Sequence, residues 1–395
     1  MKMLILHSEL GVLRGGGENF TRNLFKAFAG RGHQVAAAFA AGAGGSYPLP
    51  LPPGIKAMPI PGWWSMNLGQ ASLSFIGRQV PENLGAYWNR LQEAIGWRVF
   101  RWHNRRFEKR IEVEFSRRWA DYDAVYVHSN PFLASKVARR RPTILRLAGP
   151  VGSDVTPELR SVRAVCANGD AFRQVHAFLG DHAIELPTGL DNCLFRPGPS
   201  SVRATLGWPD ESRVVGYVGR LTHIKAVDIL AAVFGDLSRK RADLRLLLIG
   251  HGEEEKNIRG ILANELSRGL VHIEAGVNHE KLPEWYRAMD LLVMPSRYEN
   301  FSNAIVEAMA CGVPFLASNV GGNRLLADTG AGWLFQEGSV IALTLALSSL
   351  IENRAELRAR GIIGSRYARG HFSWDSSAQL LEEIIQSRIG MGRCR

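Results

Sequence analysis

Two carboxylates lie where proteins with parallel sheets commonly bind ligands. Glu299 follows a short apolar strand that ends at Pro295, and Glu307 lies about two turns inside a helical pattern that begins near Phe301. The free amides and positive dipole end of a first helical turn suit a phosphate or an oxygen-rich sugar. Both carboxylates could accept hydrogen bonds from vicinal hydroxyls. A charge complement at the helix start and a solvated glutamate explain these two residues equally well.

Two cations follow the first strand expected in the second half of the chain. Arg220 and Lys225 come directly after the apolar run Val214–Val218. Cations at the carboxyl end of a strand can stabilise the charge that develops on a diphosphate leaving group. A solvated basic loop would account for either residue alone, but it accounts poorly for the pair at this position.

A glycine loop opens the first helical pattern of the chain. Arg14-Gly15-Gly16-Gly17-Glu18 comes straight after the strand Met3–His7. Glycine permits close backbone approach to a ligand, and a helix start favours an anion. The signal is generic in α/β folds, and the dinucleotide-binding pattern with its ribose-binding acid does not follow.

The elements that must position these residues alternate between short apolar strands and helices, which is typical of parallel sheets covered on both faces. The pattern runs twice along the chain and predicts two doubly wound α/β domains. The strands expected are 3–7, 34–40, 124–128, 143–147, 164–167 and 183–186, then 214–218, 244–249, 271–274, 291–294 and 314–317. The joint is expected within 189–201, where Pro197, Gly198 and Pro199 interrupt every periodicity.

The stretch from Glu299 to Glu307, followed by Ala-Met-Ala-Cys-Gly-Val-Pro, resembles the central motif of the retaining GT-B glycosyltransferases of the GT4 family, the glycosyl transferases group 1. The resemblance covers most of the chain, is specific over residues 186–330 and is loose over 41–123. It implies two Rossmann-like domains that face each other across a cleft. The implied parts are 1–188, 189–371 and a crossover helix within 372–395 that returns to the first domain.

The resemblance also implies roles for individual residues. Arg220, Lys225 and Glu299 would be catalytic, with Glu299 on the donor sugar. Glu18 and His128 would lie on the acceptor side. The remaining donor-binding positions, with Glu307 on the nucleotide ribose, would be Gly16, Gly17, Gly219, Gly250, Val277, Asn300, Phe301, Ser302, Asn303 and Glu307.

Two positions depart from the family pattern. Ala226 follows Lys225 where the family usually has glycine, which we expect to alter the turn more than the chemistry. Ala148 occupies the position where many members carry a histidine beside the donor sugar, and His128 is the candidate substitute. A structural role for a lone histidine is the alternative. In the family the departing phosphate is thought to take the acceptor proton, so this departure removes no essential step.

Composition limits the class of protein. The 395 residues are 46% apolar and 22% charged, with a net charge of +11. Such a chain is globular, and its positive charge favours an anionic partner: nucleic acid, an acidic membrane surface or a phosphorylated substrate. No apolar run reaches the ~20 residues of a membrane span, and four scattered cysteines indicate reduced thiols in a cytoplasmic protein. No cluster suggests a metal site, and the nucleotide sugar is a co-substrate, so no cofactor is expected.

Residues 61–120 interrupt the alternation and form a basic, aromatic insertion. They hold six of the ten tryptophans, and residues 78–119 carry ten Lys and Arg against five Glu. Trp88, Leu91, Ile95, Val99 and Trp102 share one helical face. We expect helices that contact an anionic membrane surface through this face. Ordinary packing onto the sheet is the alternative.

These observations predict a retaining, metal-independent transferase that moves a hexose from a nucleotide-diphosphate sugar, UDP-linked before GDP-linked, to a hydroxyl of a glycan, glycolipid or small molecule. A cytoplasmic location is expected, with peripheral contact at the inner membrane face. A nucleotide-sugar epimerase of the same architecture is the enzymatic rival, although the Glu299/Glu307 pair argues against it. The positive charge also leaves a nucleic-acid-binding or DNA-modifying protein open, and such binding would weaken steeply with salt.

Overall fold

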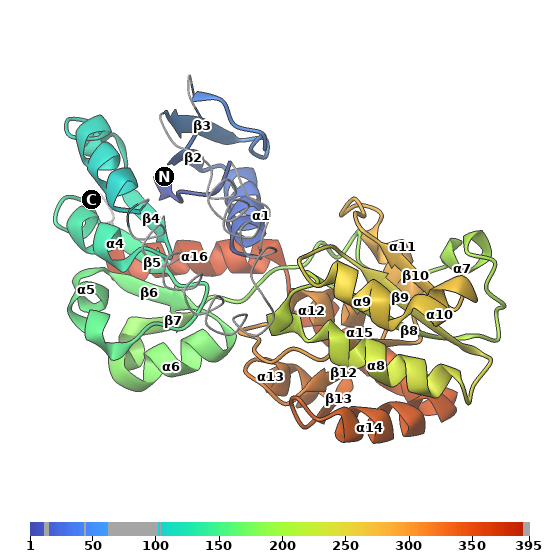
Figure 1. Ribbon diagram of the computed structural model, residues 1–395. Coiled ribbons are helices and arrows are strands. Elements are labelled where there is room, and N and C mark those ends of the chain that lie inside the picture. Colours follow the sequence, from blue (N-terminus) through green and yellow to red (C-terminus); the bar gives the residue numbers. More distant parts are fainter. Residues whose placement is uncertain (12–15, 43–44, 62–101, 103, 390–395) are drawn as a thin grey trace, which may run out of the picture. The chain divides into compact units, whose positions relative to one another are not determined.

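The computed structural model describes residues 1–389 except 12–15, 43–44, 62–101 and 103 (Figure 1). The chain divides into two compact units. The first comprises Met1–Ala167, Ala171–Leu186 and Asp375–Arg395, and the second comprises Asn168–Asp170 and Pro187–Trp374.

The first unit is built on a seven-stranded sheet in the order β3-β2-β1-β4-β5-β6-β7, with every neighbouring pair parallel. Its strands are nearly continuous apolar runs, as expected for strands buried on both faces. They are β1 (Lys2–Leu6), β2 (Gln34–Ala40), β3 (Ile55–Ile60), β4 (Ala124–His128), β5 (Thr143–Arg146), β6 (Ala164–Ala167) and β7 (Ala183–Glu185).

Helices follow the strands of the first unit in alternation. The glycine loop leads directly into the first of these helices, and the last helix of the chain also belongs to this unit. They are α1 (Gly16–Gly30), α4 (Pro131–Ala138), α5 (Thr156–Ser161), α6 (Gly169–Leu179) and α16 (Trp374–Ile389), with a further helical stretch over residues 104–114.

The second unit holds a six-stranded parallel sheet in the order β10-β9-β8-β11-β12-β13. Its first strand in the sequence, β8, is central, so the chain turns back from one side of the sheet to the other. Ligands of such sheets bind at the carboxyl ends of strands where the order reverses. The strands are β8 (Arg213–Val218), β9 (Leu244–Ile249), β10 (Val271–Glu274), β11 (Leu291–Met294), β12 (Phe315–Ser318) and β13 (Gly332–Phe335).

The helices of the second unit alternate with these strands and contribute one face each to a single apolar core. They are α7 (Val202–Thr205), α8 (Val227–Ser238), α9 (Glu255–Ile261), α10 (Ala263–Ser267), α11 (Leu282–Arg287), α12 (Asn303–Ala310), α13 (Asn323–Ala327), α14 (Val340–Glu352) and α15 (Arg354–His371).

The α/β fold class is confirmed, and the expected strands lie within one residue of the observed bounds. Two strands, β3 and β13, were not predicted. Both lie at sheet edges. β3 carries Pro59 and the exposed Lys56, which edge strands tolerate because one side of the strand has no neighbour, and which hide the apolar pattern.

The described part of the 61–120 insertion packs as core. Residues 104–114 are helical, and Phe107, Ile111 and Phe115 are fully buried beneath the first sheet's apolar cluster. Trp119 is also buried, whereas Trp102 is 54% exposed. The packing alternative therefore holds for this end of the insertion. Most of the predicted membrane face, including Trp88, Leu91, Ile95 and Val99, lies outside the described residues.

Ion pairs attach α16, the red helix labelled in Figure 1, to the rest of the first unit. Arg31 donates two hydrogen bonds of 2.9 Å to the Glu382 carboxylate, and His33 Nε2 lies 2.5 Å from it. The hydrogen bond from Arg31 is the main reason that the pKa of Glu382 falls to about 2. None of the described helices is both long and apolar enough to cross a membrane.

Candidate active site

Lys225 and Glu299 form an ion pair at the carboxyl ends of two neighbouring strands. Lys225 ends the 3-10 turn His223–Lys225 after β8, and Glu299 follows β11, which pairs with β8 in the sheet. The Lys225 Nζ lies 2.5 Å from Glu299 Oε2, and the two side chains are only 17% and 12% exposed. Adjacent strands thus bring together two predicted catalytic residues that are 74 positions apart in the sequence.

Arg220 lies on the same loop as Lys225 but points into the open. Its side chain is exposed and has no ion-pair partner among the residues that the structure describes. The Tyr217 hydroxyl donates a 2.7 Å hydrogen bond to the Arg220 carbonyl and so fixes the start of the loop. Burial raises the pKa of Tyr217, and the negative charge of Glu299 raises it further, whereas the positive charge of Arg220 lowers it. The charges of Glu299 and Arg220 are thus both felt at the Tyr217 hydroxyl.

Glycines let the loops after β8 and β9 touch through their backbones. A Cβ on Gly250, whose φ is +136°, would lie 1.9 Å from the Gly219 carbonyl oxygen. The Gly219 amide in turn donates to Ile249 at 2.9 Å, and Leu221 donates to His251 at 2.9 Å. The close approach of the loops therefore requires a glycine at position 250, whereas a Cβ on Gly219, at φ +153°, would lie 2.8 Å from the Tyr217 hydroxyl.

A second glycine contact, which the sequence reasoning missed, supports Glu299. A Cβ on Gly321, at φ +44°, would lie 1.8 Å from the Glu299 carbonyl oxygen, and the Gly322 amide donates to that oxygen at 3.1 Å. The Gly-Gly pair between β12 and α13 was the available signal, because it repeats the strand–glycine–helix pattern of the other loops.

The helix α12 begins within the segment Asn300 to Asn303, whose amides were predicted to lie near the sugar and phosphate. Ser302 caps the helix by accepting from the Ile305 amide at 3.3 Å, and Asn303 is its first residue. The helix thus begins two residues after Phe301, whose ring packs 5.8 Å from that of Phe372. Phe301 and Ser302 therefore contribute backbone here, since their side chains are engaged in packing and capping, while Asn300 and Asn303 are half-buried.

Glu307 contacts Tyr286 rather than the Lys225–Glu299 pair. The Tyr286 hydroxyl donates to Glu307 Oε2 at 2.8 Å, and burial raises the pKa of Glu307 to about 7 although this hydrogen bond opposes it. Tyr286 was not predicted, because an aromatic residue on α11 carries no sequence signal for this contact. Val277, another predicted donor residue, is half-buried against the core of the second unit.

The first unit brings its own predicted residues together. Gly16 and Gly17 begin α1, and a Cβ on Gly17 would lie 2.7 Å from His128 Nε2 and 3.8 Å from the Ala148 Cβ. His128 therefore stands beside the family's usual histidine position. Glu18 is buried, and its Oε1 lies 3.4 Å from His7 Nε2.

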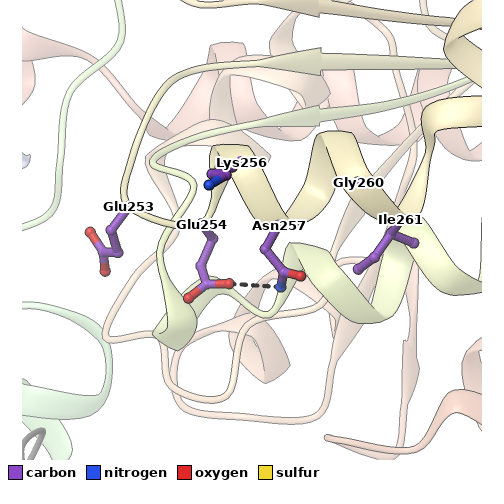
Figure 2. A pocket seen from close by; sticks show the side chains of 6 residues that line it. All are labelled: Glu253, Glu254, Lys256, Asn257, Gly260 and Ile261. Carbon is purple, nitrogen blue, oxygen red and sulfur yellow. Dashed lines mark hydrogen bonds between the residues drawn. The ribbon is translucent and has the colours of Figure 1, made fainter. Parts of the chain in front are cut away.

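An open pocket elsewhere in the second unit has a different lining. Figure 2 shows it around the start of α9, where Asn257 donates a 3.0 Å hydrogen bond to Glu254. None of the predicted site residues lines it. Its carboxylates, Glu253 and Glu254, would repel a diphosphate, so we place no donor there. Within the described ranges no group of three or more His, Cys, Asp or Glu side chains could hold a metal ion.

The sequence of this chain is similar to those of known glycosyltransferases. The profile of the glycosyl transferases group 1 family matches residues 200–366. D-inositol 3-phosphate glycosyltransferase 1 of Catenulispora acidiphila is 30% identical over 312 residues, which are 70% of this chain and 74% of that protein. Other relatives described as D-inositol 3-phosphate glycosyltransferases are 30–34% identical, but the matches cover only 44–57% of their length.

Two solved structures resemble almost the whole chain. Sucrose-phosphate synthase from Thermosynechococcus elongatus has a TM-score of 0.77 at 18% identity and covers 99% of this chain and 100% of its own. Anabaena HepE in complex with UDP and glucose has a TM-score of 0.67 at 19% identity, covering 98% and 100%. Together with the two parallel sheets, these similarities establish the GT-B fold. With the strand-end ion pair, the family profile and the Catenulispora relative in agreement, the chain belongs to the GT4 family of glycosyltransferases, the glycosyl transferases group 1.

Proposed function

We propose that this protein transfers a hexose from a UDP-linked donor to a hydroxyl of a small-molecule acceptor, with retention of anomeric configuration and without a metal ion. The observation that carries the proposal is the Lys225–Glu299 ion pair at neighbouring strand ends, with Arg220 exposed on the same loop.

Charge stabilisation is the main task of this site. Cleavage of the donor develops negative charge on the departing diphosphate, and preorganised cations lower the free energy of that state. Glu299 holds the Lys225 ammonium in one place before the donor arrives, with a 2.5 Å contact. Its second carboxylate oxygen can accept hydrogen bonds from sugar hydroxyls. Arg220 adds a planar cation suited to two phosphate oxygens.

Glu307 suits the ribose of the nucleotide. Its carboxylate accepts from Tyr286, which fixes its orientation and leaves the other oxygen for a ribose hydroxyl. HepE, a protein of similar fold, was solved with UDP and glucose. This supports a UDP-linked donor before a GDP-linked one.

Retention follows if the acceptor hydroxyl attacks from the side of the leaving group and the departing phosphate takes its proton. Arg220 and Lys225 would supply the positive charge that a divalent cation supplies in other transferases. No dedicated base is then needed from the protein.

The acceptor is the least constrained part of the proposal. The Catenulispora relative is named for transfer to D-inositol 3-phosphate, so a phosphorylated polyol is the first acceptor to test. A net charge of +11 favours such an anionic substrate. Glycans and glycolipids remain the alternatives that fit the predicted, undescribed membrane face of the insertion.

The test is a transfer assay with UDP-glucose, UDP-N-acetylglucosamine and GDP-mannose against inositol 3-phosphate, inositol and a glycolipid extract. We expect turnover with a UDP-sugar, an α-linked product by NMR from an α-linked donor, and the same rate in excess EDTA. A product of inverted configuration would contradict retention. Loss of activity in EDTA that magnesium restores would overturn metal independence, and interconversion of the donor without an acceptor would favour an epimerase.

A further inference from the structure

A hydrogen-bonded cluster lies beside Gly17, at the start of α1 in the first unit. His7 follows β1, His128 ends β4, and Thr21 lies one turn into α1. The two imidazole rings stack at 3.9 Å with an angle of 12° between them. Thr21 Oγ1 lies 3.2 Å from His7 Nδ1 and 3.3 Å from His128 Nδ1.

The number of protons on Thr21 fixes the direction of each of these hydrogen bonds. Its hydroxyl lies 3.1 Å from the Gly17 carbonyl oxygen, which can only accept, so the single hydroxyl proton points there. Thr21 Oγ1 can therefore only accept from the two histidines. The Tyr126 hydroxyl makes no hydrogen bond of good geometry with the described residues, but an interaction with Thr21 acts on its pKa; a Thr21 proton directed at Tyr126 would equally leave none for the histidines. Both imidazoles must donate from Nδ1.

His128 then carries its lone pair on Nε2. Burial, the positive charge of His7 and that of Arg146 all hold the pKa of His128 well below its usual range, so the ring is neutral with one proton. That proton is on Nδ1. Nε2 has no hydrogen-bond partner among the described residues and lies 2.7 Å from where a Cβ on Gly17 would be.

Among the residues that the structure describes, small residues lie next to this nitrogen. Gly17 has no side chain. Apart from the His128 ring, the nearest atom to the position that a Cβ on Gly17 would take is the Ala148 Cβ, at 3.8 Å. Any larger side chain at position 17 would block Nε2. The first turn of α1 thus presents an acceptor nitrogen next to free backbone amides, which are donors.

We propose that Thr21 is a positioning residue that locks His128 in the Nδ1-protonated tautomer, so that His128 Nε2 accepts a hydrogen bond from a hydroxyl of a sugar or polyol substrate. The assignment of a substrate hydroxyl rests on the proposed function, whereas the tautomer does not. A hydroxyl is the ligand chemistry that fits, because a lone pair would repel phosphate oxygens and carboxylates.

The tautomer can be measured on the full chain labelled with 15N-histidine. Long-range 1H–15N spectra at neutral pH separate protonated from unprotonated ring nitrogens, and the His128 signals are assigned by their loss in His128→Gln. We expect an unprotonated Nε2 in the wild type and in Thr21→Ser, which keeps the hydroxyl. In Thr21→Val, which has the same shape without a hydroxyl, the proton should move to Nε2. A wild-type spectrum with a protonated Nε2, or an unchanged one in Thr21→Val, would overturn the lock.

The ligand is tested on the same samples. Saturating UDP-glucose, or UDP with inositol 3-phosphate, should shift the Nε2 resonance upfield in the direction of hydrogen bonding, and the arm that does so identifies donor or acceptor as the source. Thr21→Val should lower kcat/KM by roughly tenfold while Thr21→Ser stays near wild type, because a donor replaces an acceptor at the contact. No Nε2 shift with either ligand, or full activity in a Thr21→Val protein whose tautomer has changed, would overturn the hydroxyl contact. Failure of all transfer activity would refute the proposed function and leave the tautomer result standing.

Discussion

The two units position chemical groups in different ways. In the second unit, glycines at φ +136° and +44° let loops touch through backbone atoms, and the charged pair follows from strand order. In the first unit, the glycine at position 17 faces an imidazole, and side chains hold one another through Thr21. Backbone contacts fix where a group lies, whereas side-chain contacts also fix which atom carries the proton.

The ionisable groups of the two units can be compared by how burial and neighbouring charges affect their pKa values. Lys225 and Glu299 neutralise each other directly. In the first unit, Glu9 has its pKa raised to about 7 by burial and by the nearby charge of Glu18. Burial opposes ionisation of Glu18, but the hydrogen bond and charge of His7, together with two further hydrogen bonds, lower the pKa of Glu18 overall. Both units thus hold one carboxyl whose pKa burial raises to about 7, Glu9 in the first unit and Glu307 in the second.

The largest expected effect is on the cations of the second unit. Arg220→Ala or Lys225→Ala removes charge that stabilises the departing diphosphate, so turnover should fall by about a hundredfold or more. Lys256→Ala, which removes an exposed cation of the same unit, is the matched control. Steady-state kinetics with circular dichroism as a folding check measure this. Unchanged turnover in both single variants would remove these residues from the mechanism.

Glycine-to-alanine substitutions should change the free energy of unfolding more where the glycine contacts backbone, as in the second unit, than where it contacts a side chain, as in the first. Gly321→Ala drives a methyl into the Glu299 carbonyl at a positive φ, so the free energy of unfolding should fall by about 2–3 kcal/mol. Gly260→Ala, with nothing within 4 Å on a helix, should leave stability the same or raise it by up to ~1 kcal/mol.

Gly17→Ala completes this comparison, because it meets a side chain rather than backbone. It should fold nearly as well as the wild type and lose activity instead. Urea unfolding of the three variants measures their free energies of unfolding. A Gly321→Ala protein as stable as Gly260→Ala would show that backbone contact does not govern the second unit.

A pH effect of intermediate size is expected at Glu307. Its pKa of about 7 means that the carboxyl is mostly neutral at pH 6 and mostly ionised at pH 8. Only the ionised form accepts with both oxygens, one from Tyr286 and one from a ribose hydroxyl, so affinity for uridine, which carries no phosphate, should rise up to about tenfold over this range. Calorimetry measures the affinity, and Glu307→Gln should show no such rise. The opposite slope would mean that the neutral acid binds the nucleoside.

The smallest effect should come from Ala226. It adopts φ +50° and ψ +38°, the left-handed conformation that glycine reaches without strain, and it is fully buried. Ala226→Gly should relieve about 1 kcal/mol of strain but lose a similar amount through the freer unfolded chain. We expect stability within about 0.5 kcal/mol of the wild type and turnover within twofold. A large gain in turnover would contradict this expectation and show that the conformation of Ala226 restricts the Lys225 loop in a way that slows the reaction.

Much of the second unit's site was readable because its signals are local. The residues after Val218 and Pro295 end apolar strands, and parallel strands place their carboxyl ends at one edge. The Lys225–Glu299 contact follows once β8 and β11 are neighbours. The Gly-Gly pair at Gly321 could have been recognised from the sequence but was not. The edge strands β3 and β13 have a weaker apolar pattern, since an edge strand pairs on one side only.

The sequence by itself determined the order of the strands except the edge strands β3 and β13, and it showed where the glutamates, cations and glycines follow them, because apolar periodicity is a property of a few neighbouring residues. Only the tertiary structure decided that Tyr286 meets Glu307, that Glu382 binds Arg31, and that Thr21 lies between two histidines. Thr21 and His128 are 107 positions apart. Nothing in the spacing of a threonine on a helix indicates such a partner, since the contact depends on which strands become neighbours and on how the side chains pack once the sheet has formed.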